Sequence, residues 1–286
     1  MCQERNNIMP GDSFYDPQAM SSFFDSYGER EWQRLVATPI TEISLHIHRH
    51  YLQRYIAPGA RVLEIGAGAG RFTQILVGLG ARVVAADISS GQLELNRRHA
   101  AELDFSSGVE DWFQADLCDL SGFADADFDA VVVYGGPFSY VLDRRDAALA
   151  ECLRVLKPGG VLLMSVMCLW GSVRRHLAAV VQGTPPEANW QIIATGDITP
   201  HTYPQRQDNF MHLFRASELR AWLEAAGLEV LALSASGCLG WPESTMMETL
   251  RSDAQLWEEL LRMELEASAA PGCLDMGTHL IAAARR

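Results

Sequence analysis

The chain has 286 residues, of which 48% are hydrophobic and 21% charged, a composition typical of globular proteins that excludes a disordered or fibrous chain. Aspartate and glutamate number 36 against 23 lysines and arginines, and the resulting formal net charge of −13 disfavours binding to nucleic-acid phosphates. The six cysteines are scattered without a CxxC pair, so we expect reduced thiols in a cytoplasmic protein.

Neither a membrane span nor a secretory signal is apparent in the sequence. No apolar stretch approaches the ~20 residues that a membrane-spanning helix needs. Residues 1–16 lack the apolar segment of a secretory signal. We therefore expect a soluble protein that has neither a membrane nor a nucleic acid as partner and is a monomer or a homodimer.

The N-terminal part is predicted to be helical. Residues 21–35 read as a helix interrupted near Gly28, and residues 43–55 carry apolar side chains at helical spacing up to a stop at Pro58. We expect residues 1–57 to form a helical cap on the domain that follows.

From residue 61 onward, short apolar runs alternate with helical segments. Strands are expected at 61–65, 82–86, 112–114, 129–134 and 161–166, and helices at 72–79, 92–103 and 146–156. Strands that alternate with helices through short loops indicate a parallel sheet covered on both faces.

The alternation of predicted strands and helices stops after Met167 and resumes near residue 216. A helix is expected at 169–181, no clear period at 183–207, then a helix at 216–226 capped by Ser217, a strand at 228–234, a helix at 248–267 and a last strand at 278–283. We expect one domain over residues 1–286, with an insertion at 167–214 rather than a second domain.

Glycines stand at every second position between the first strand and its helix. Gly66, Gly68 and Gly70 permit a tight turn and the close approach of a ligand to the backbone. A dinucleotide fingerprint spaces its glycines G-x-G-x-x-G, so the third glycine comes one residue early, and Glu64 adds negative charge beside the loop. Both features disfavour a diphosphate and therefore an NAD-dependent oxidoreductase.

Acidic residues end the next two strands. Asp87 follows the second strand, where a carboxylate can accept from both ribose hydroxyls of a nucleoside, and Asp116 follows the third, where it can accept from an adenine amino group. Either acid alone is more often a solvated loop residue or a helix cap. Their joint placement indicates a nucleoside ligand.

With these motifs the chain resembles the class I S-adenosylmethionine (SAM)-dependent methyltransferases of the small-molecule type. The resemblance rests on the glycine loop at 64–70, Asp87, the step Ala115-Asp116-Leu117, the strand at 128–134 and the turn at 153–160. It is strong over residues 45–166 and looser over 216–286. The resemblance implies an α/β fold with a Rossmann-like, doubly wound seven-stranded sheet that is mostly parallel and has an antiparallel last strand.

The resemblance also implies SAM as the cofactor. It puts the three glycines beside the methionine and ribose, Glu64 near the ammonium group, Asp87 on the ribose, Asp116 at the adenine and Tyr134 beside the sulfonium. The cofactor-binding residues so expected are Glu64, Gly66, Gly68, Gly70, Asp87, Ile88, Asp116, Leu117, Tyr134 and Gly135. A zwitterion that bears a sulfonium suits an acidic pocket.

The N-terminal cap offers further candidates. Tyr27 and Arg30 lie one helical turn apart and can close over the cofactor, with Arg30 pairing its carboxylate. The alternative is that Tyr27 and Trp32 only pack the cap onto the domain. Of the cap histidines we expect His48 to point into the pocket. No metal is expected, because the histidines lack further ligands at a suitable spacing.

The acceptor is expected to be a small, partly apolar molecule beneath the insertion at 167–214. Aromatic residues expected at its border are Tyr140, Trp170 and Trp241. His201 and Tyr203, in a loop bounded by prolines, are the first candidates for a general base, followed by His48.

Three functions remain open at this point. The first is methyl transfer to oxygen or nitrogen of a small metabolite, which releases S-adenosylhomocysteine. The second is another use of the sulfonium, such as intramolecular cyclisation, which releases methylthioadenosine. The third is a non-catalytic SAM-binding protein. Methylation of nucleic acid or protein is disfavoured by the charge and by Gly-Gly-Pro-Phe at 135–138, where such enzymes carry an Asn-Pro-Pro-Tyr-type motif.

Overall fold

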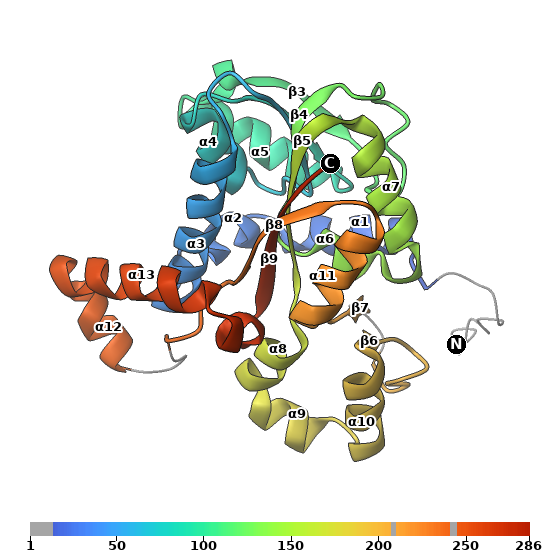
Figure 1. Cartoon of the computed structure of the whole chain (residues 1–286), viewed down its shortest axis with the longest axis vertical. Coiled ribbons are helices and arrows are strands. Elements are labelled where there is room, and N and C mark those ends of the chain that lie inside the picture. The colour runs from blue at the N-terminus through green and yellow to red at the C-terminus, as the bar shows by residue number, and fades with distance from the viewer. Residues whose placement is uncertain (1–13, 207–209, 241–244) are drawn as a thin grey trace.

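The computed structural model describes residues 14–206, 210–240 and 245–286 (Figure 1). Its central sheet is built from β1 (Arg61–Ile65), β2 (Arg82–Asp87), β3 (Val109–Gln114), β4 (Phe128–Val133), β5 (Leu156–Met167), β8 (Glu229–Ala235) and β9 (His279–Arg285). The strand order is β3-β2-β1-β4-β5-β9-β8, and β9 runs antiparallel to both of its neighbours while the other pairs are parallel. The predicted Rossmann-like sheet is confirmed.

Hydrophobic clusters cover both faces of the sheet, since the central strands are apolar on both sides. Val131 and Leu162 face a cluster that contains residues of α7 (Arg145–Val155) and α11 (Ala216–Ala225). The next residues along these strands, Val132 and Leu163, face a cluster with α3 (Pro39–Tyr55) and α4 (Arg71–Gly78). Figure 1 shows the two pairs of helices on opposite sides of the sheet.

Two N-terminal helices lie across the carboxyl edge of the parallel strands. They are α1 (Pro17–Tyr27) and α2 (Arg30–Arg34), separated at Gly28 as predicted, whereas the longer α3 packs on a face of the sheet. The side chain of Asp16 accepts from the first backbone N–H groups of α1, and Thr38 does the same for α3. Helix α1 packs on α5 (Ser90–Glu102), where Gln92 donates to the carbonyl oxygen of Phe24 at 3.0 Å.

The insertion contains more regular structure than predicted. It holds α8 (Leu169–Arg175), α9 (Leu177–Gly183), α10 (Pro186–Thr195) and the small hairpin of β6 (Asp197–Ile198) and β7 (Met211–His212). The single helix predicted at 169–181 is wrong, because the chain leaves the helical conformation at His176. The segment at 183–207 also includes a helix that starts at a proline and ends at Gly196, whose φ is +81°.

Two further predictions in the C-terminal part are wrong. The helix expected at 248–267 is divided into α12 (Thr245–Ser252) and α13 (Ala254–Ala269), since the Asp253 side chain accepts from two backbone N–H groups and starts a new helix. Arg215, not Ser217, is the residue before α11, and the Glu218 carboxylate accepts from its backbone N–H. The remaining short elements are the helix α6 (Pro137–Tyr140) and three 3₁₀ helices, η1 (Ser106–Gly108), η2 (Leu142–Arg144) and η3 (Pro271–Met276).

A side chain of helix α13 holds the loop that follows β8 in place through hydrogen bonds. Glu264 is fully buried, and its carboxylate accepts from the backbone N–H groups of Cys238, Leu239 and Gly240 at 2.8, 3.1 and 2.6 Å. Across the described ranges, no helix is long and apolar enough to cross a membrane.

Replacement of Glu264 by alanine is expected to lower the free energy of unfolding by about 3–5 kcal/mol, because three backbone donors lose their acceptor in a buried site. Urea denaturation measures the change. The matched control is Glu266→Ala on the exposed face of the same helix, for which we expect a change within about 0.5 kcal/mol. Equal stability of the two variants would contradict this role of Glu264.

Candidate functional site

A cavity of about 570 Å³ lies at the carboxyl edge of the parallel strands, beneath α1 and α2. Its walls come from the glycine loop, the ends of β2 and β4, the start of α6, the junction of α8 with α9, and the start of β9. In parallel α/β sheets this edge is where ligands bind. The cavity is therefore the candidate functional site.

The glycine loop forms one wall and leaves no room for side chains. Gly66, Gly68 and Gly70 have φ values of +74°, +51° and +98°, a region that L-residues with side chains rarely adopt. A Cβ atom on Gly66 would lie 2.7 Å from Cγ of Pro137, and one on Gly70 would lie 2.9 Å from the Asn96 side chain. Gly66 and Gly68 line the cavity, whereas Gly70 begins α4 behind it.

A buried polar network supports this loop from beneath. The Thr73 hydroxyl donates to the Glu64 carboxylate at 2.7 Å, and the Asn96 amide donates to Thr73 at 2.9 Å and to the Gly68 carbonyl at 3.3 Å. Burial raises the pKa of Glu64 to about 8. Glu64 thus lies below the loop rather than among the residues that line the cavity, and its contact with a cofactor ammonium stays a prediction.

Asp87 joins the glycine loop to the turn after β2. Its two carboxylate oxygens accept from the backbone N–H of Gly68 and of Ser89, each at 2.8 Å. The residue is 6% exposed, and burial raises its pKa to about 6 despite these two hydrogen bonds. Because each carboxylate oxygen can accept twice, both keep the capacity for a ribose hydroxyl.

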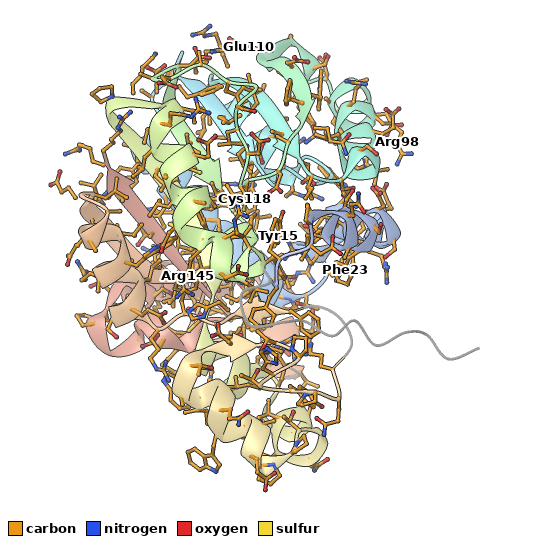
Figure 2. The ribbon with its side chains drawn as sticks, turned by 90° about the vertical axis from the view of Figure 1, so that its right-hand side faces the viewer. Tyr15, Phe23, Arg98, Glu110, Cys118 and Arg145 are labelled. Atoms are coloured by element: carbon orange, nitrogen blue, oxygen red, sulfur yellow. The ribbon has the colours of Figure 1, made fainter. Side chains whose placement is uncertain are left out.

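The side of the cavity next to Asp87 is apolar. Met20, Ile88, Ala115 and Leu117 line it. Asp116 is not among the lining residues, because its Oδ1 accepts from the Tyr15 hydroxyl at 2.7 Å and from the backbone N–H of Cys118 at 2.8 Å. Figure 2 shows Tyr15 close to Cys118.

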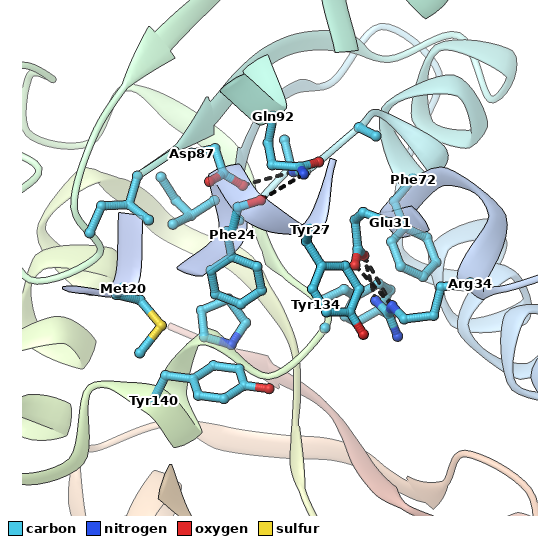
Figure 3. Close-up of a pocket in the computed structure, with 18 of the residues that line it drawn as sticks. Met20, Phe24, Tyr27, Glu31, Arg34, Phe72, Asp87, Gln92, Tyr134 and Tyr140 are labelled. Atoms are coloured by element: carbon cyan, nitrogen blue, oxygen red, sulfur yellow. Dashed lines mark hydrogen bonds and ion pairs between the residues drawn. The ribbon is translucent and has the colours of Figure 1, made fainter. Parts of the chain in front are cut away.

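The cap places Tyr27 in the cavity wall but turns Arg30 away. The Arg30 guanidinium donates to the carbonyl oxygens of Tyr27 and Ser26 at 3.1 and 2.9 Å. One turn further, Glu31 and Arg34 form an ion pair inside the cavity at 2.6 Å (Figure 3). Neither residue was predicted for the site, since a Glu-x-x-Arg pair on a helix is usually a solvated surface pair.

This ion pair spans two parts of the wall. If Gly68 carried a Cβ atom, that atom would lie 3.3 Å from Cγ of Glu31. A Cβ atom on Gly135 would lie 3.8 Å from Nη2 of Arg34. The pair therefore lies between the glycine loop and the end of β4, where the resemblance puts the amino-acid portion of the cofactor.

Aromatic rings surround the middle of the cavity. Phe23, Phe24, Tyr27, Tyr134 and Tyr140 line it, and the rings of Phe24 and Tyr140 meet edge to face at 5.8 Å. His48 packs behind Tyr134 with ring centroids 4.7 Å apart and is 3% exposed; it is not a lining residue. Burial lowers the pKa of His48 to about 4, so its ring is neutral near pH 7.

The end of the cavity opposite Asp87 is polar. Thr41, Arg175, His176, Thr278 and His279 line it. A second, smaller pocket of about 190 Å³ adjoins this end and shares Arg175, Thr278 and His279 with the cavity. Burial, together with His48 and Arg34, lowers the pKa of His279 to about 3. The imidazole of His279 is therefore neutral at physiological pH.

The residues predicted to carry catalysis in the insertion lie elsewhere. His201 is exposed and packs its ring against Phe14 at 5.0 Å, and the Tyr203 hydroxyl donates to the Gly183 carbonyl at 3.1 Å. Neither lines the cavity, nor does Trp170, which is 42% exposed. Trp241 lies outside the described residues. The insertion instead contributes Arg175 and His176 to the wall.

The residues present fit the cofactor that the resemblance implies. The Oε1 atom of Gln92 is buried in the cavity wall and finds no hydrogen-bond partner among the described residues, which suits a donor such as a hydroxyl or ammonium group. The glycine loop approaches closely because it has no side chains, and Asp87 has spare acceptor capacity. Glu31 and Arg34 match the two charges of a zwitterionic amino acid.

Comparison with known proteins also indicates a methyltransferase. Residues 63–164 match the family model described as "Methyltransferase domain". Over 181 residues the chain is 34% identical to a demethylmenaquinone methyltransferase of Clavibacter sepedonicus, which covers 61% of this chain and 68% of that protein. It is 28% identical over 181 residues to a ubiquinone biosynthesis O-methyltransferase of Xanthomonas campestris pv. campestris, covering 63% and 67%.

A solved structure shares the fold at lower sequence identity. It is an S-adenosylmethionine-dependent methyltransferase from Mesorhizobium loti, with 19% identity, a TM-score of 0.52, and coverage of 80% of this chain and 92% of that chain.

The affinity for S-adenosylhomocysteine is expected to increase about tenfold from pH 5 to pH 7. Asp87, with a pKa of about 6, is mostly protonated at the lower pH and ionised at the higher one, and only the carboxylate accepts from both ribose hydroxyls. Isothermal titration calorimetry measures the dissociation constant at each pH. Asp87→Asn is expected to bind more weakly and without this slope; an unchanged slope in that variant would assign the titration to another group.

Proposed function

We propose a function on the premise that this chain belongs to the class I S-adenosylmethionine-dependent methyltransferase family: it methylates a hydroxyl oxygen of a small, ring-bearing metabolite. One observation carries the proposal. A single cavity holds a nucleoside cradle at one end, aromatic walls in the middle and a neutral imidazole at the other end. The name of the Xanthomonas relative, an O-methyltransferase, supports oxygen as the acceptor atom.

The cofactor end orients the methyl donor. Bound SAM supplies an electrophilic methyl group, whose bond to sulfur breaks with the electron pair kept by sulfur as the bond to the acceptor oxygen forms. Asp87 would hold the ribose, and Ile88 and Leu117 would form the apolar site for the adenine. The cap residues Glu31 and Arg34, which pair with each other in this structure, would hold the ammonium and carboxylate groups of the cofactor.

The middle of the cavity aligns the acceptor. Substitution at the methyl carbon needs the oxygen, the carbon and the sulfur in line, so most of the rate enhancement comes from orientation. Phe24 and Tyr140, whose rings contact each other, form an aromatic wall on which a flat ring packs, and Gly135 offers an approach without a side chain. Helix α1 covers the site and excludes water.

His279 takes the proton of the hydroxyl group. Its Nδ1 lies 3.3 Å from the Thr278 hydroxyl, which leaves Nε2 for the acceptor. Strand β9 holds the residue rigidly, with its backbone N–H donating to the Ser236 hydroxyl at 3.1 Å. The neutral ring has a free lone pair, and because its pKa is low it accepts the proton as the O–CH3 bond forms, when the proton on that oxygen becomes strongly acidic.

The reaction is tested by incubating the protein with SAM and a set of hydroxylated aromatic compounds and identifying the products by mass spectrometry. Methyl transfer gives S-adenosylhomocysteine and a product heavier by one methyl group. Methylthioadenosine in its place would establish the alternative use of the sulfonium, and binding of SAM without consumption would establish a non-catalytic role.

His279→Asn is expected to lower kcat about a hundredfold while the affinity for S-adenosylhomocysteine stays within twofold, because the imidazole acts on the acceptor and not on the cofactor. His201→Asn, which alters an exposed histidine outside the cavity wall, is expected to retain turnover. The opposite result, with loss of turnover only in the His201 variant, would move the proton acceptor into the insertion.

A further inference from the structure

We propose that the acceptor carries a carboxylate group and that Arg175 binds it at the end of the cavity opposite Asp87. This inference rests on the proposed methyl transfer and names the class of its substrate: hydroxylated aromatic carboxylic acids. Arg175 is the last residue of α8, and it lines both the cavity and the adjoining smaller pocket.

Arg175 is distinguished from its neighbours by its lack of a partner. Within the described ranges it forms no hydrogen bond and no ion pair, although it is half-buried. The preceding residue, Arg174, donates to the Met276 carbonyl at 3.2 Å and so fastens α8 to η3. Arg34, the other arginine in the wall near Arg175, is paired with Glu31.

The acidic groups nearest to this end are already engaged. Among the residues that line the cavity the carboxylates are Asp87 and Glu31, and both belong to the cofactor end. In the adjoining pocket the carboxylate is that of Glu264, whose two oxygens accept from three backbone N–H groups of the loop at 238–240. None of these groups pairs with Arg175.

The other polar groups at this end carry no charge near pH 7. Burial and the nearby Arg175 lower the pKa of His176, and His279 is neutral as described above. The carboxylates of the cavity wall thus lie at the cofactor end, where Arg34 and Arg71 also line it, whereas the charged group among the described lining residues of the opposite end is the Arg175 guanidinium. A half-buried guanidinium without a counter-ion is poorly solvated, and a carboxylate ligand satisfies it with two parallel hydrogen bonds.

The shape of the cavity joins this anion site to the methyl-transfer position. The rings of Phe24 and Tyr140 meet between the two ends, since Tyr140 follows β4, which lies in the sheet between β2, whose end carries Asp87, and β9, whose start carries His279. A flat molecule packed on these rings would have one edge at the turn after β4 and the other directed to α8. The hydroxyl group and the carboxylate thus belong on opposite edges of the ring.

The test uses the protein loaded with S-adenosylhomocysteine and three acids: 4-hydroxybenzoate, 3,4-dihydroxybenzoate and 4-hydroxycinnamate. Isothermal titration calorimetry compares each acid with its methyl ester, which keeps the ring and hydroxyl groups but removes the charge. We expect at least one acid to bind about tenfold or more tightly than its ester. Arg175→Gln is expected to reduce this preference to within twofold while the affinity for S-adenosylhomocysteine is unchanged.

The matched control is Arg220→Gln, which removes a positive charge from the exposed face of α11, where Arg220 pairs with Glu224 at 3.6 Å. This variant is expected to keep the preference. Arg175→Lys, which retains the charge without the two-pronged geometry, is expected to show an intermediate preference, and it serves if the Gln variant fails to fold by circular dichroism.

Two results would overturn the proposal. One is wild-type protein that binds S-adenosylhomocysteine but binds no acid more tightly than its ester. The other is an acid preference that persists in both Arg175 variants. Failure of the wild type to bind S-adenosylhomocysteine would instead contradict the proposed methyl transfer, so the two failures are distinguishable.

Discussion

The carboxylate of Asp87 connects two loops that come from neighbouring strands, and the cavity depends on that connection. One oxygen accepts from the backbone of the glycine loop and the other from the turn that starts α5. Since α5 also holds α1 through Gln92, the position of the cap follows from the same junction. Both carboxylate oxygens are hydrogen-bonded, which offsets part of the cost of burying the charge, and each keeps the capacity to accept once more at the cavity wall.

The sheet and its cofactor end were predictable because their signals are local. Each strand is a short apolar run, the three glycines stand at alternate positions of one loop, and Asp87 ends its strand. The elements that were predicted wrongly depend on backbone details with weak signatures. The chain bends at His176 without a proline or glycine, and Asp253 starts a new helix inside an otherwise continuous periodic pattern.

The acceptor end was not predictable because its residues meet only through tertiary structure. Thr41, Arg175 and His279 come from three distant parts of the chain. His279 reaches the site because β9 runs against its neighbours, so the strand begins, rather than ends, at the ligand-binding edge. The aromatic composition of the insertion correctly suggested ordered structure, but it carried no information on which of its side chains face inward, and His201 and Tyr203 do not line the cavity.

The two ends of the cavity are encoded in separable stretches of the chain. The glycine loop, Asp87 and Gly135 fall within the segment at 63–164 that matches the methyltransferase family, while Arg175 and His279 fall outside it. If the proposed function holds, substitutions in α8 and at the start of β9 would change what is methylated without altering the glycine loop or Asp87. Such an arrangement lets one donor-binding half be combined with many acceptor-binding halves during evolution, and it makes exchange of the later segment the natural route to altered specificity.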